Sequence, residues 1–270
     1  MSGLAELHLH LDGSLRASTL NELAARAGLQ VPPQLRFHAG MGLDEALSKF
    51  AFTLSLLQTP DAVRRVAAEI CEDTRADGVD ALELRFAPQL HQGAPLEAIV
   101  DAALEGVAGR AGLILCVLYG ESPELASKLV DVAAARPGVV GVDLAGGPAP
   151  FHRFGMQAYA PAFTRARDVG LGRTVHAGEG RPAQELRVAI EQLHAQRIGH
   201  GTTLLSAPDV VDLVLERGVT IEACPTSNVH TGVIADVASH PLPQWLELGI
   251  KACVCADNSL LSNVTTSQEL

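Results

Sequence analysis

The chain has 270 residues, of which 47% are hydrophobic, enough to bury the core of one large domain. Aromatic residues make up only 4%, so the core must be built from aliphatic side chains. The formal net charge is −11 and no basic run occurs, which excludes a nucleic-acid partner because phosphate backbones are bound by clustered Lys and Arg. An acidic surface is compatible with a small neutral substrate.

The cysteine count and the length of the apolar runs indicate the cellular compartment in which the protein is expected. There are five cysteines, an odd number, and residues 1–6 are too short to form the apolar core of a secretory signal. We therefore expect reduced thiols and a cytoplasmic protein. No apolar run reaches the ~18 residues that a membrane-spanning helix needs, so we expect no membrane partner.

Eight short apolar runs, typical of buried strands, alternate along the chain with longer segments of helical periodicity. The predicted strands are Ala5–His10, Ala81–Ala87, Leu113–Tyr119, Val139–Leu144, Arg173–His176, Arg197–His200, Thr220–Ala223 and Lys251–Ala256. The predicted helices are Asp61–Asp77, Leu96–Ala111, Glu124–Ala135, Ala160–Val169, Pro182–Gln196 and Ala207–Glu216. This order predicts parallel strands with helical crossovers, and eight repeats predict an α/β fold of the (β/α)8 TIM-barrel type. An open, doubly wound sheet is the alternative.

Two segments depart from this rhythm. Residues 17–61 form a long insertion after the first strand, and its Phe-rich part around Phe50 and Phe52 predicts either ordinary helix packing or a lid above the mouth. The chain stops at Leu270, shortly after the last strand, so we expect it to lack the final C-terminal helices of a regular barrel. No repeat or low-complexity segment divides residues 1–270, which we expect to form a single domain.

Polar residues concentrate at the carboxyl ends of the predicted strands, where barrel enzymes build their sites. His8 and His10 end the first strand, His176 ends the fifth, His200 ends the sixth, and Asp257 follows the eighth. Alternate strand residues point to one face, so His8 and His10 can both aim into the mouth. Taken alone, this pair is more typical of core or solvated histidines. Three histidines with a carboxylate at matching positions indicate a zinc site.

Two further residues suit proton transfer near such a metal. Glu179 lies three residues after His176, which can place a carboxyl beside a metal without binding it. Taken alone, Glu179 is better explained as a surface residue of a loop. His200 stands between two glycines and could bind a metal, hold a hydroxide by a hydrogen bond, or cap the next loop. Asp257 emerges from an apolar run and needs a cation or a partner there, unless it caps a helix.

With these residues assembled, the chain resembles the adenosine deaminase family of the amidohydrolase superfamily, from about Glu6 to Asn258. The order and spacing of several segments together carry the resemblance. They are residues 6–13, 50–60, 83–88, 143–146, 176–179, 197–201, 224–228 and the segment around Asp257. The resemblance implies hydrolysis of adenosine or 2′-deoxyadenosine to inosine or deoxyinosine and ammonia.

The resemblance also implies a role for each matching residue. One zinc ion per chain would be held by His8, His10, His176 and Asp257. The fourth strand ends in Asp143-Leu144 and has no lysine that could bridge a second metal. Glu179 would protonate the purine ring, and His200 would orient the attacking hydroxide. These two are the expected catalytic residues.

Three residues are implied for substrate binding. Asp12 would contact the ribose 5′-hydroxyl, and the backbone N–H of Gly146 would bind a purine ring nitrogen. Asn258 stands where the family commonly has a second aspartate, and its amide can donate the same hydrogen bond without being protonated. A small purine nucleoside is therefore the expected partner.

Other functions remain open from the sequence. Within the same chemistry, the substrate could be adenine or a modified adenosine such as an aminodeoxyfutalosine-type nucleoside. Asp12 favours a ribose-bearing substrate, since free adenine has no 5′-hydroxyl. A general metal-dependent amide or ester hydrolase is a different class, against which the position of Glu179 argues. A zinc-binding homologue without activity is the non-enzymatic alternative.

Overall fold

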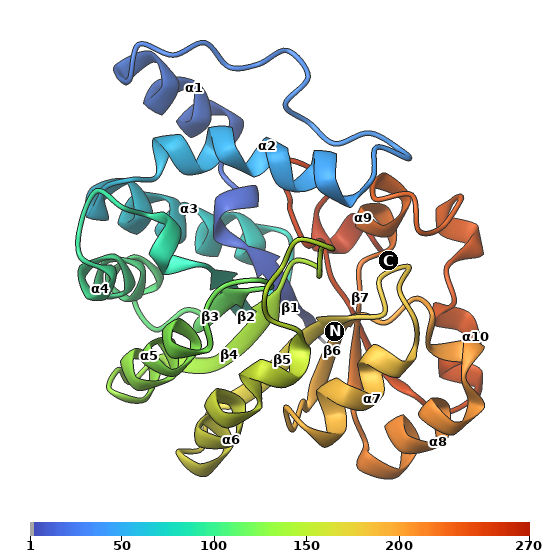
Figure 1. Cartoon of the computed structure of the whole chain (residues 1–270). Coiled ribbons are helices and arrows are strands. Elements are labelled where there is room, and N and C mark those ends of the chain that lie inside the picture. The colour runs from blue at the N-terminus through green and yellow to red at the C-terminus, as the bar shows by residue number, and fades with distance from the viewer. Residues whose placement is uncertain (1–2) are drawn as a thin grey trace.

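The structure, a computed structural model, describes residues 3–270, and eight parallel strands form its central sheet in the order β1 to β8. Figure 1 shows these strands at the centre of the molecule with helices around them. The strands are β1 Leu4–His10, β2 Val79–Phe86, β3 Gly112–Leu118, β4 Val139–Ala145, β5 Gly172–Ala177, β6 Arg197–His200, β7 Thr220–Ala223 and β8 Lys251–Val254. Each predicted strand is present, with bounds shifted by at most two residues.

The first and last strands meet at the mouth. Leu9 and Asp257 form a parallel bridge, and the His10 backbone N–H donates to the Asp257 carbonyl at 2.8 Å. The sheet is thereby a nearly closed barrel, which confirms the predicted TIM-type fold and excludes the open sheet. Within residues 3–270, β8 is followed by no α-helix, only by the 3-10 helix η6 (Thr266–Gln268), as expected from the short segment available.

Helices connect successive strands around the outside. They are α3 Pro60–Ala76, α4 Leu96–Val107, α5 Pro123–Ala134, α6 Ala160–Asp168, α7 Gln184–Glu191, α8 Pro208–Arg217, and, between β7 and β8, α9 Pro225–His230 and α10 Leu242–Glu247. Local sequence explains where several begin and end. Thr59 caps α3 by accepting from the Ala62 N–H, and Pro60 follows at the first position. Gly218 ends α8 in the left-handed conformation that glycine adopts without strain.

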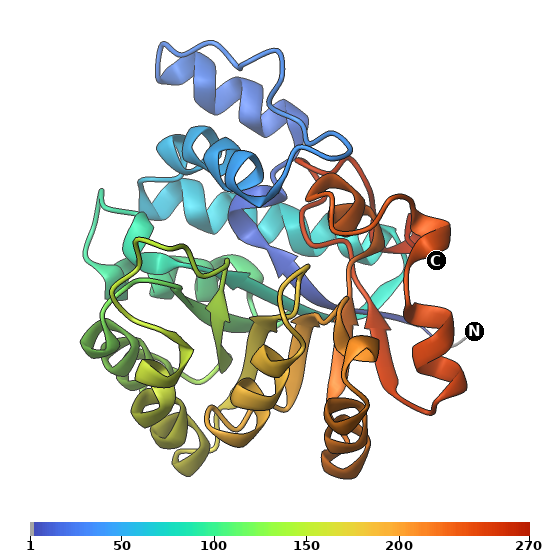
Figure 2. The ribbon, with the colours of Figure 1, turned by 45° about the vertical axis from the view of Figure 1, so that its right-hand side comes forward.

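The insertion after β1 forms two helices, α1 (Ala17–Arg26) and α2 (Leu43–Leu56). In the views of Figures 1 and 2, α2 lies between α1 and the barrel. Phe50 and Leu54 of α2 line the cavity at the barrel mouth, so this helix covers the site as well as packing on the core.

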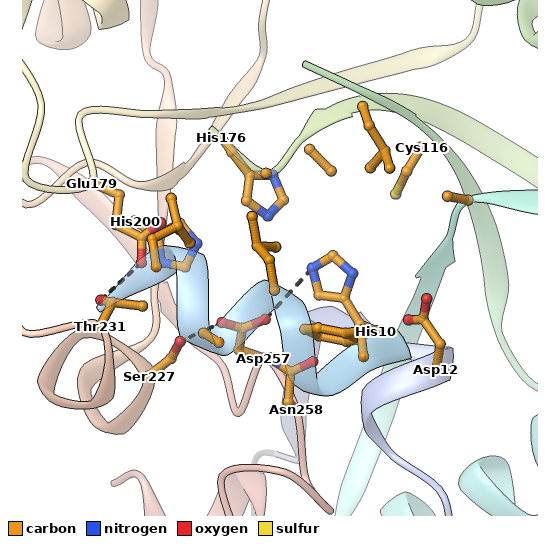
Figure 3. Close-up of a pocket in the computed structure, with 18 of the residues that line it drawn as sticks. His10, Asp12, Cys116, His176, Glu179, His200, Ser227, Thr231, Asp257 and Asn258 are labelled. Atoms are coloured by element: carbon orange, nitrogen blue, oxygen red, sulfur yellow. Dashed lines mark hydrogen bonds and ion pairs between the residues drawn. The ribbon is translucent and has the colours of Figure 1, made fainter. Parts of the chain in front are cut away.

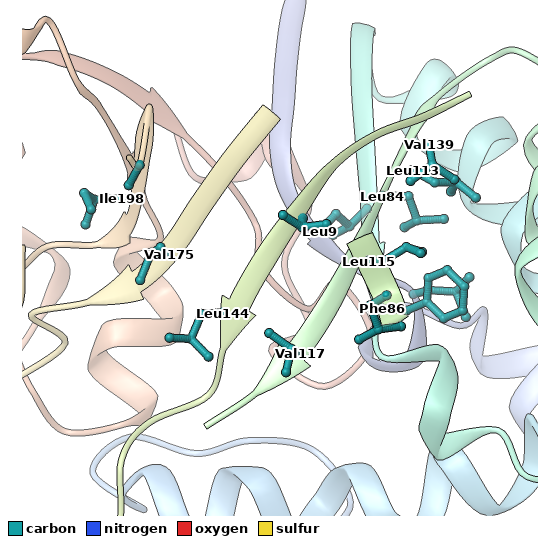
Figure 4. Packing of buried hydrophobic residues seen from close by; sticks show 14 of the residues in the cluster. Leu9, Leu84, Phe86, Leu113, Leu115, Val117, Val139, Leu144, Val175 and Ile198 are labelled. Carbon is teal, nitrogen blue, oxygen red and sulfur yellow. The ribbon is translucent and has the colours of Figure 1, made fainter. Parts of the chain in front are cut away.

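Aliphatic side chains of the strands fill the space beneath the helices (Figure 4). Leu84, Phe86, Leu113 and Leu115 are fully buried, each removing apolar surface worth roughly 1.5–3 kcal/mol from water. Alternation along β2 points the intervening Arg85 the other way, into the barrel. Within residues 3–270, no helix has the length and apolar character needed to cross a bilayer.

Candidate active site

A cavity of about 230 Å³ opens at the carboxyl ends of the strands, beneath α2. Eight of the nine residues predicted for the site line it, namely His10, Asp12, Gly146, His176, Glu179, His200, Asp257 and Asn258. The ninth, His8, is completely buried. Figure 3 shows Glu179, His200 and Thr231 at one end of the cavity, Asp12 and Cys116 at the other, and His10, His176 and Asp257 between them.

The four residues predicted as metal ligands lie close together. The imidazole centroids of His8 and His176 are 4.6 Å apart, and those of His8 and His10 are 5.3 Å apart. Asp257 Oδ1 is 3.5 Å from His10 Nε2 and 3.7 Å from His8 Nε2. Ligand atoms of His8, His10 and Asp257 all lie within 4.8 Å of one another, and so do those of His8, His176 and His200. Geometry alone thus leaves His200 as a competing ligand.

The chemistry of this donor set fits a metal ion such as zinc. His8 Nδ1 bonds Glu222 Oε2 at 2.7 Å, while His8 Nε2 is buried without a hydrogen-bond partner among the described residues. Such an orphaned nitrogen is costly in a protein interior unless it has a ligand. Burial lowers the pKa of both His8 and His10, which keeps their imidazoles neutral, the form that coordinates metals.

A buried ionic network supports two of these imidazoles from below. His176 Nδ1 lies 3.2 Å from Asp143 Oδ1, and His8 Nδ1 lies 2.7 Å from Glu222 Oε2. The Arg85 guanidinium joins the two carboxylates, at 2.8 Å from each, and all three charged side chains are completely buried. Burial alone would raise the pKa of Asp143, but His176 and Arg85 outweigh it and lower that pKa. Both carboxylates can therefore orient a ligand histidine.

Burial shifts the pKa values of the two predicted catalytic residues in opposite directions. Glu179 is buried, and this burial raises the pKa of its carboxyl above the usual value. Burial lowers the pKa of His200 to about 3, so its ring is neutral. Glu179 Oε2 lies 3.8 Å from His200 Nε2 at the same end of the cavity. The site thus combines a carboxyl whose pKa is raised with an uncharged imidazole.

Backbone strain marks two of the strand-end residues. His200 and Asp257 have φ angles of 69° and 62°, in the left-handed region that non-glycine residues rarely adopt. Neighbouring backbone hydrogen bonds hold them there, from Gly201 N to the Ala177 carbonyl and from His10 N to the Asp257 carbonyl. Strained conformations of this kind concentrate at functional sites, where the surrounding fold maintains them.

Two polar atoms outside the Glu179 end of the cavity are unsatisfied, one on Asp12 at the opposite end and one on Asn258 beside Asp257 (Figure 3). Asp12 Oδ1 and Asn258 Oδ1 are both buried without a hydrogen-bond partner in the described part of the chain. Burial raises the pKa of Asp12 to about 7. A side chain at Gly13 would collide with Asn258, so glycine there gives the amide its place. These two groups are positioned to hydrogen-bond a ligand.

The sequence interpretation missed the supporting residues. Arg85, Asp143 and Glu222 were not predicted for the site. Asp143 and Glu222 are each the one charged residue of their strand, a pattern that could have identified them, whereas Arg85 shares its strand with two other charged residues. No site role was predicted from the residues of the segment 224–228, which is among those that carry the family resemblance. In the structure it forms most of α9, and residues of α9 and its C-terminal cap bond Asp257, His200 and Glu179.

Known proteins are similar to this chain over nearly its whole length. The family model described as Adenosine deaminase matches residues 3–270. An adenosine deaminase from Clostridium acetobutylicum is 35% identical over 283 residues, which cover 98% of this chain and 84% of the relative.

Solved structures of deaminases are similar in fold. An adenine deaminase from Arthrobacter aurescens has a TM-score of 0.89 at 27% identity, covering 99% of this chain and 85% of that one. An N6-methyl-AMP deaminase from Arabidopsis thaliana has a TM-score of 0.85 at 26% identity, covering 99% and 84%. With the family model and the sequence relative, these similarities establish that the chain belongs to the adenosine deaminase family, hydrolases that act on carbon–nitrogen bonds.

Proposed function

We propose that this protein hydrolyses the 6-amino group of adenosine and 2′-deoxyadenosine, giving inosine or deoxyinosine and ammonia. The observation that carries the proposal is the meeting of Glu179, whose buried carboxyl has a raised pKa, and a neutral His200 beside the His8, His10, His176 and Asp257 cluster in one cavity. Those four residues would hold one zinc ion per chain. Zinc in such a site supplies Lewis-acid activation of water at neutral pH.

The protein's own residues complete the chemistry. Glu179 donates its proton to the ring nitrogen beside the amino-bearing carbon, which makes that carbon a better electrophile. His200 orients the attacking water by a hydrogen bond. The carbon–oxygen bond forms as water adds. One proton of the water passes to the amino group and the other restores the Glu179 carboxyl, and the carbon–nitrogen bond breaks to release ammonia. The burial that raises the pKa of Glu179 favours the protonated carboxyl that this step requires.

The far end of the cavity favours an uncharged nucleoside. The reacting carbon must lie near Glu179, so the rest of the substrate extends toward Asp12 and Cys116 (Figure 3). The described residues that line the cavity include no Lys or Arg, and most of those at this end are apolar, such as Leu90 and Leu118. A 5′-phosphate would meet no cation there. This distinguishes the proposal from the nucleotide substrate of the similar Arabidopsis enzyme.

Adenine is the second candidate. The solved structure most similar in TM-score among those described above is an adenine deaminase, and the cavity of about 230 Å³ is small for a binding pocket. Asp12 argues for the nucleoside, because its buried Oδ1 would gain a partner from a ribose hydroxyl and none from free adenine.

The test is ammonia release from adenosine, 2′-deoxyadenosine, adenine and AMP, with zinc content measured on the same sample. We expect kcat/KM to be highest for the nucleosides and lowest for AMP. In Asp12→Ala, kcat/KM for adenosine should fall roughly tenfold or more, the effect of about 1–3 kcal/mol from one lost buried hydrogen bond. The value for adenine, which lacks ribose, should stay unchanged and serves as the internal control.

Each other outcome contradicts part of the proposal. Preferential turnover of adenine, unaffected by Asp12→Ala, would retain the reaction and replace the substrate. Preferential turnover of AMP would contradict the argument from cavity charge. A folded, zinc-loaded protein that releases ammonia from none of the four compounds would refute the enzymatic proposal for these substrates.

A further inference from the structure

Helix α9 lies against the reactive end of the cavity and bonds three of its residues. Ser227 Oγ donates to Asp257 Oδ2 at 2.6 Å. Asn228 Nδ2 lies 3.1 Å from His200 Nδ1 and 3.4 Å from Glu179 Oε1. Asn228 is completely buried and is absent from the residues lining the cavity, whereas Ser227 lines it. Asn228 therefore cannot touch a substrate, and any effect on the reaction passes through His200 and Glu179.

The surroundings of Asn228 fix which way its amide faces. The single hydroxyl proton of Thr231 has two acceptors in reach, Glu179 Oε1 at 3.1 Å and the Asn228 backbone carbonyl oxygen at 3.3 Å. The shorter contact assigns the proton to Glu179 Oε1, so this oxygen acts as an acceptor. If the Asn228 amide oxygen faced Glu179 Oε1, two acceptor oxygens would lie against each other and repel. The amide NH2 group can instead donate a hydrogen bond to Glu179 Oε1. The observed orientation leaves Asn228 Oδ1 buried without a partner among the described residues. Rotating the Asn228 amide by 180° would leave its NH2 group without a partner and would also bring its oxygen against Glu179 Oε1.

We infer that Asn228 holds His200 as the tautomer whose proton is on Nε2, and that Asn228 and Thr231 leave the acid proton of Glu179 on Oε2. The first part follows because an amide N–H donates only to an unprotonated nitrogen, so His200 Nδ1 carries the lone pair. The second follows because Oε1 already accepts two hydrogen bonds. The inference rests on the roles proposed above for Glu179 and His200.

This assignment decides between the two possible ligand sets. A protonated Nε2 has no lone pair for a metal, so His200 is a hydrogen-bond donor into the cavity and not a ligand, although it lies as near to His8 and His176 as a ligand would. The same proton can donate to the oxygen of the attacking water. Asn228 is thus a positioning residue that separates proton chemistry from metal binding.

The direct test is nitrogen NMR of the zinc-loaded enzyme labelled with 15N-histidine. The chain has ten histidines, so the His200 signals are assigned by their loss in His200→Gln. We expect protonated Nε2 and unprotonated Nδ1. A proton on Nδ1 in the unaltered enzyme overturns the inference. This readout needs no substrate, so it stands even where the proposed reaction fails.

Two variants of Asn228 connect the tautomer to turnover. Asn228→Leu keeps a similar volume without the hydrogen bonds, and kcat for adenosine should fall about 10–100-fold while KM changes less than about threefold. Asn228→Asp keeps the shape but, when ionised, can only accept, so it should move the His200 proton to Nδ1. In that case kcat should fall by about 10³–10⁴-fold, the scale seen when a catalytic imidazole is held in the wrong tautomer.

Ser227→Ala is the matched control, since Ser227 lies on the same helix but bonds Asp257 and not His200. In this control the His200 proton should stay on Nε2. If both Asn228 variants retain kcat within about threefold, or if kcat falls in Asn228→Leu while the His200 signals are unchanged, the positioning role is overturned. The second of these results would mean that Asn228 matters only for packing.

Discussion

The two ends of the cavity differ in whether their polar atoms already have partners. At the reactive end, Glu179, His200 and Asp257 are each hydrogen-bonded by α9 or its C-terminal cap. Asp12 Oδ1 at the other end, and Asn258 Oδ1 on the way to it, are buried without a partner within the described residues. Groups that are satisfied before substrate arrives are preorganised, and preorganisation is the main source of electrostatic catalysis. Groups left unsatisfied gain from a ligand, which is how a site recognises one.

The ends also differ in what lies behind them. Beneath His8 and His176 is the buried network of Asp143, Arg85 and Glu222, which spans the barrel interior from β2, β4 and β7. The substrate end is bounded by apolar side chains of α2 and of the strand ends. We therefore expect substitutions at the reactive end to change kcat, those in the network to change stability and metal retention, and those beneath α2 to change KM.

The largest effect is expected at the reactive end. Glu179→Gln keeps the shape of the side chain but cannot supply the proton, so kcat should fall about 10²–10⁴-fold with KM and zinc content nearly unchanged. In the unaltered enzyme, kcat/KM should decline as pH rises through the raised pKa of Glu179, because the acid form is lost above it. The measurements are steady-state kinetics with adenosine between pH 5 and 9.

The control is Glu216→Gln, which makes the same substitution at a side chain that is 74% exposed. It should leave both constants and the pH profile unchanged. An undiminished kcat in Glu179→Gln, or a kcat/KM that stays constant between pH 5 and 8, would mean that Glu179 does not act as the acid. Catalysis would then not be concentrated at the Glu179 end of the cavity.

The second effect tests the network. Arg85→Met leaves Asp143 buried without its arginine and Glu222 with Arg197 alone, 2.7 Å away, and breaking a buried pair in this way costs about 3–5 kcal/mol of unfolding free energy. Loss of support for His8 and His176 should also weaken zinc binding about 10–100-fold. Urea denaturation and competition with a zinc chelator measure the two quantities.

Arg64→Met is the comparison for Arg85→Met, because Arg64 pairs with the exposed residues Asp61 and Glu105 at the surface. Surface ion pairs contribute little, so its stability and zinc affinity should match those of the unaltered protein. Equal effects of the two substitutions would show that the buried network does no more than a surface pair does.

These contrasts explain what could be predicted from the sequence. The strands and the residues at their carboxyl ends follow from local patterns, namely apolar runs ended by histidine or aspartate. Helix ends were less predictable: α7 stops at Glu191 although the pattern continued to Gln196, and His194 beyond it has a left-handed φ of 55°. The network and the bonds from α9 depend on which inward positions meet across the barrel. That meeting is a long-range property that no local spacing specifies.

The smallest effect is expected beneath α2. Leu54 lines the cavity from this helix, and Leu54→Ala removes apolar contact with the substrate without touching Glu179, His200 or the ligand cluster. KM for adenosine should rise roughly tenfold, equivalent to about 1.4 kcal/mol of binding, with kcat nearly unchanged. Ser55→Ala, at an exposed neighbouring position that does not line the cavity, is the control and should change neither constant. If Leu54→Ala lowered kcat as strongly as it raised KM, α2 would help to align the reacting groups. The helix would then contribute to catalysis as well as to substrate binding, and the contrast between a catalytic end and a binding end would not hold for it.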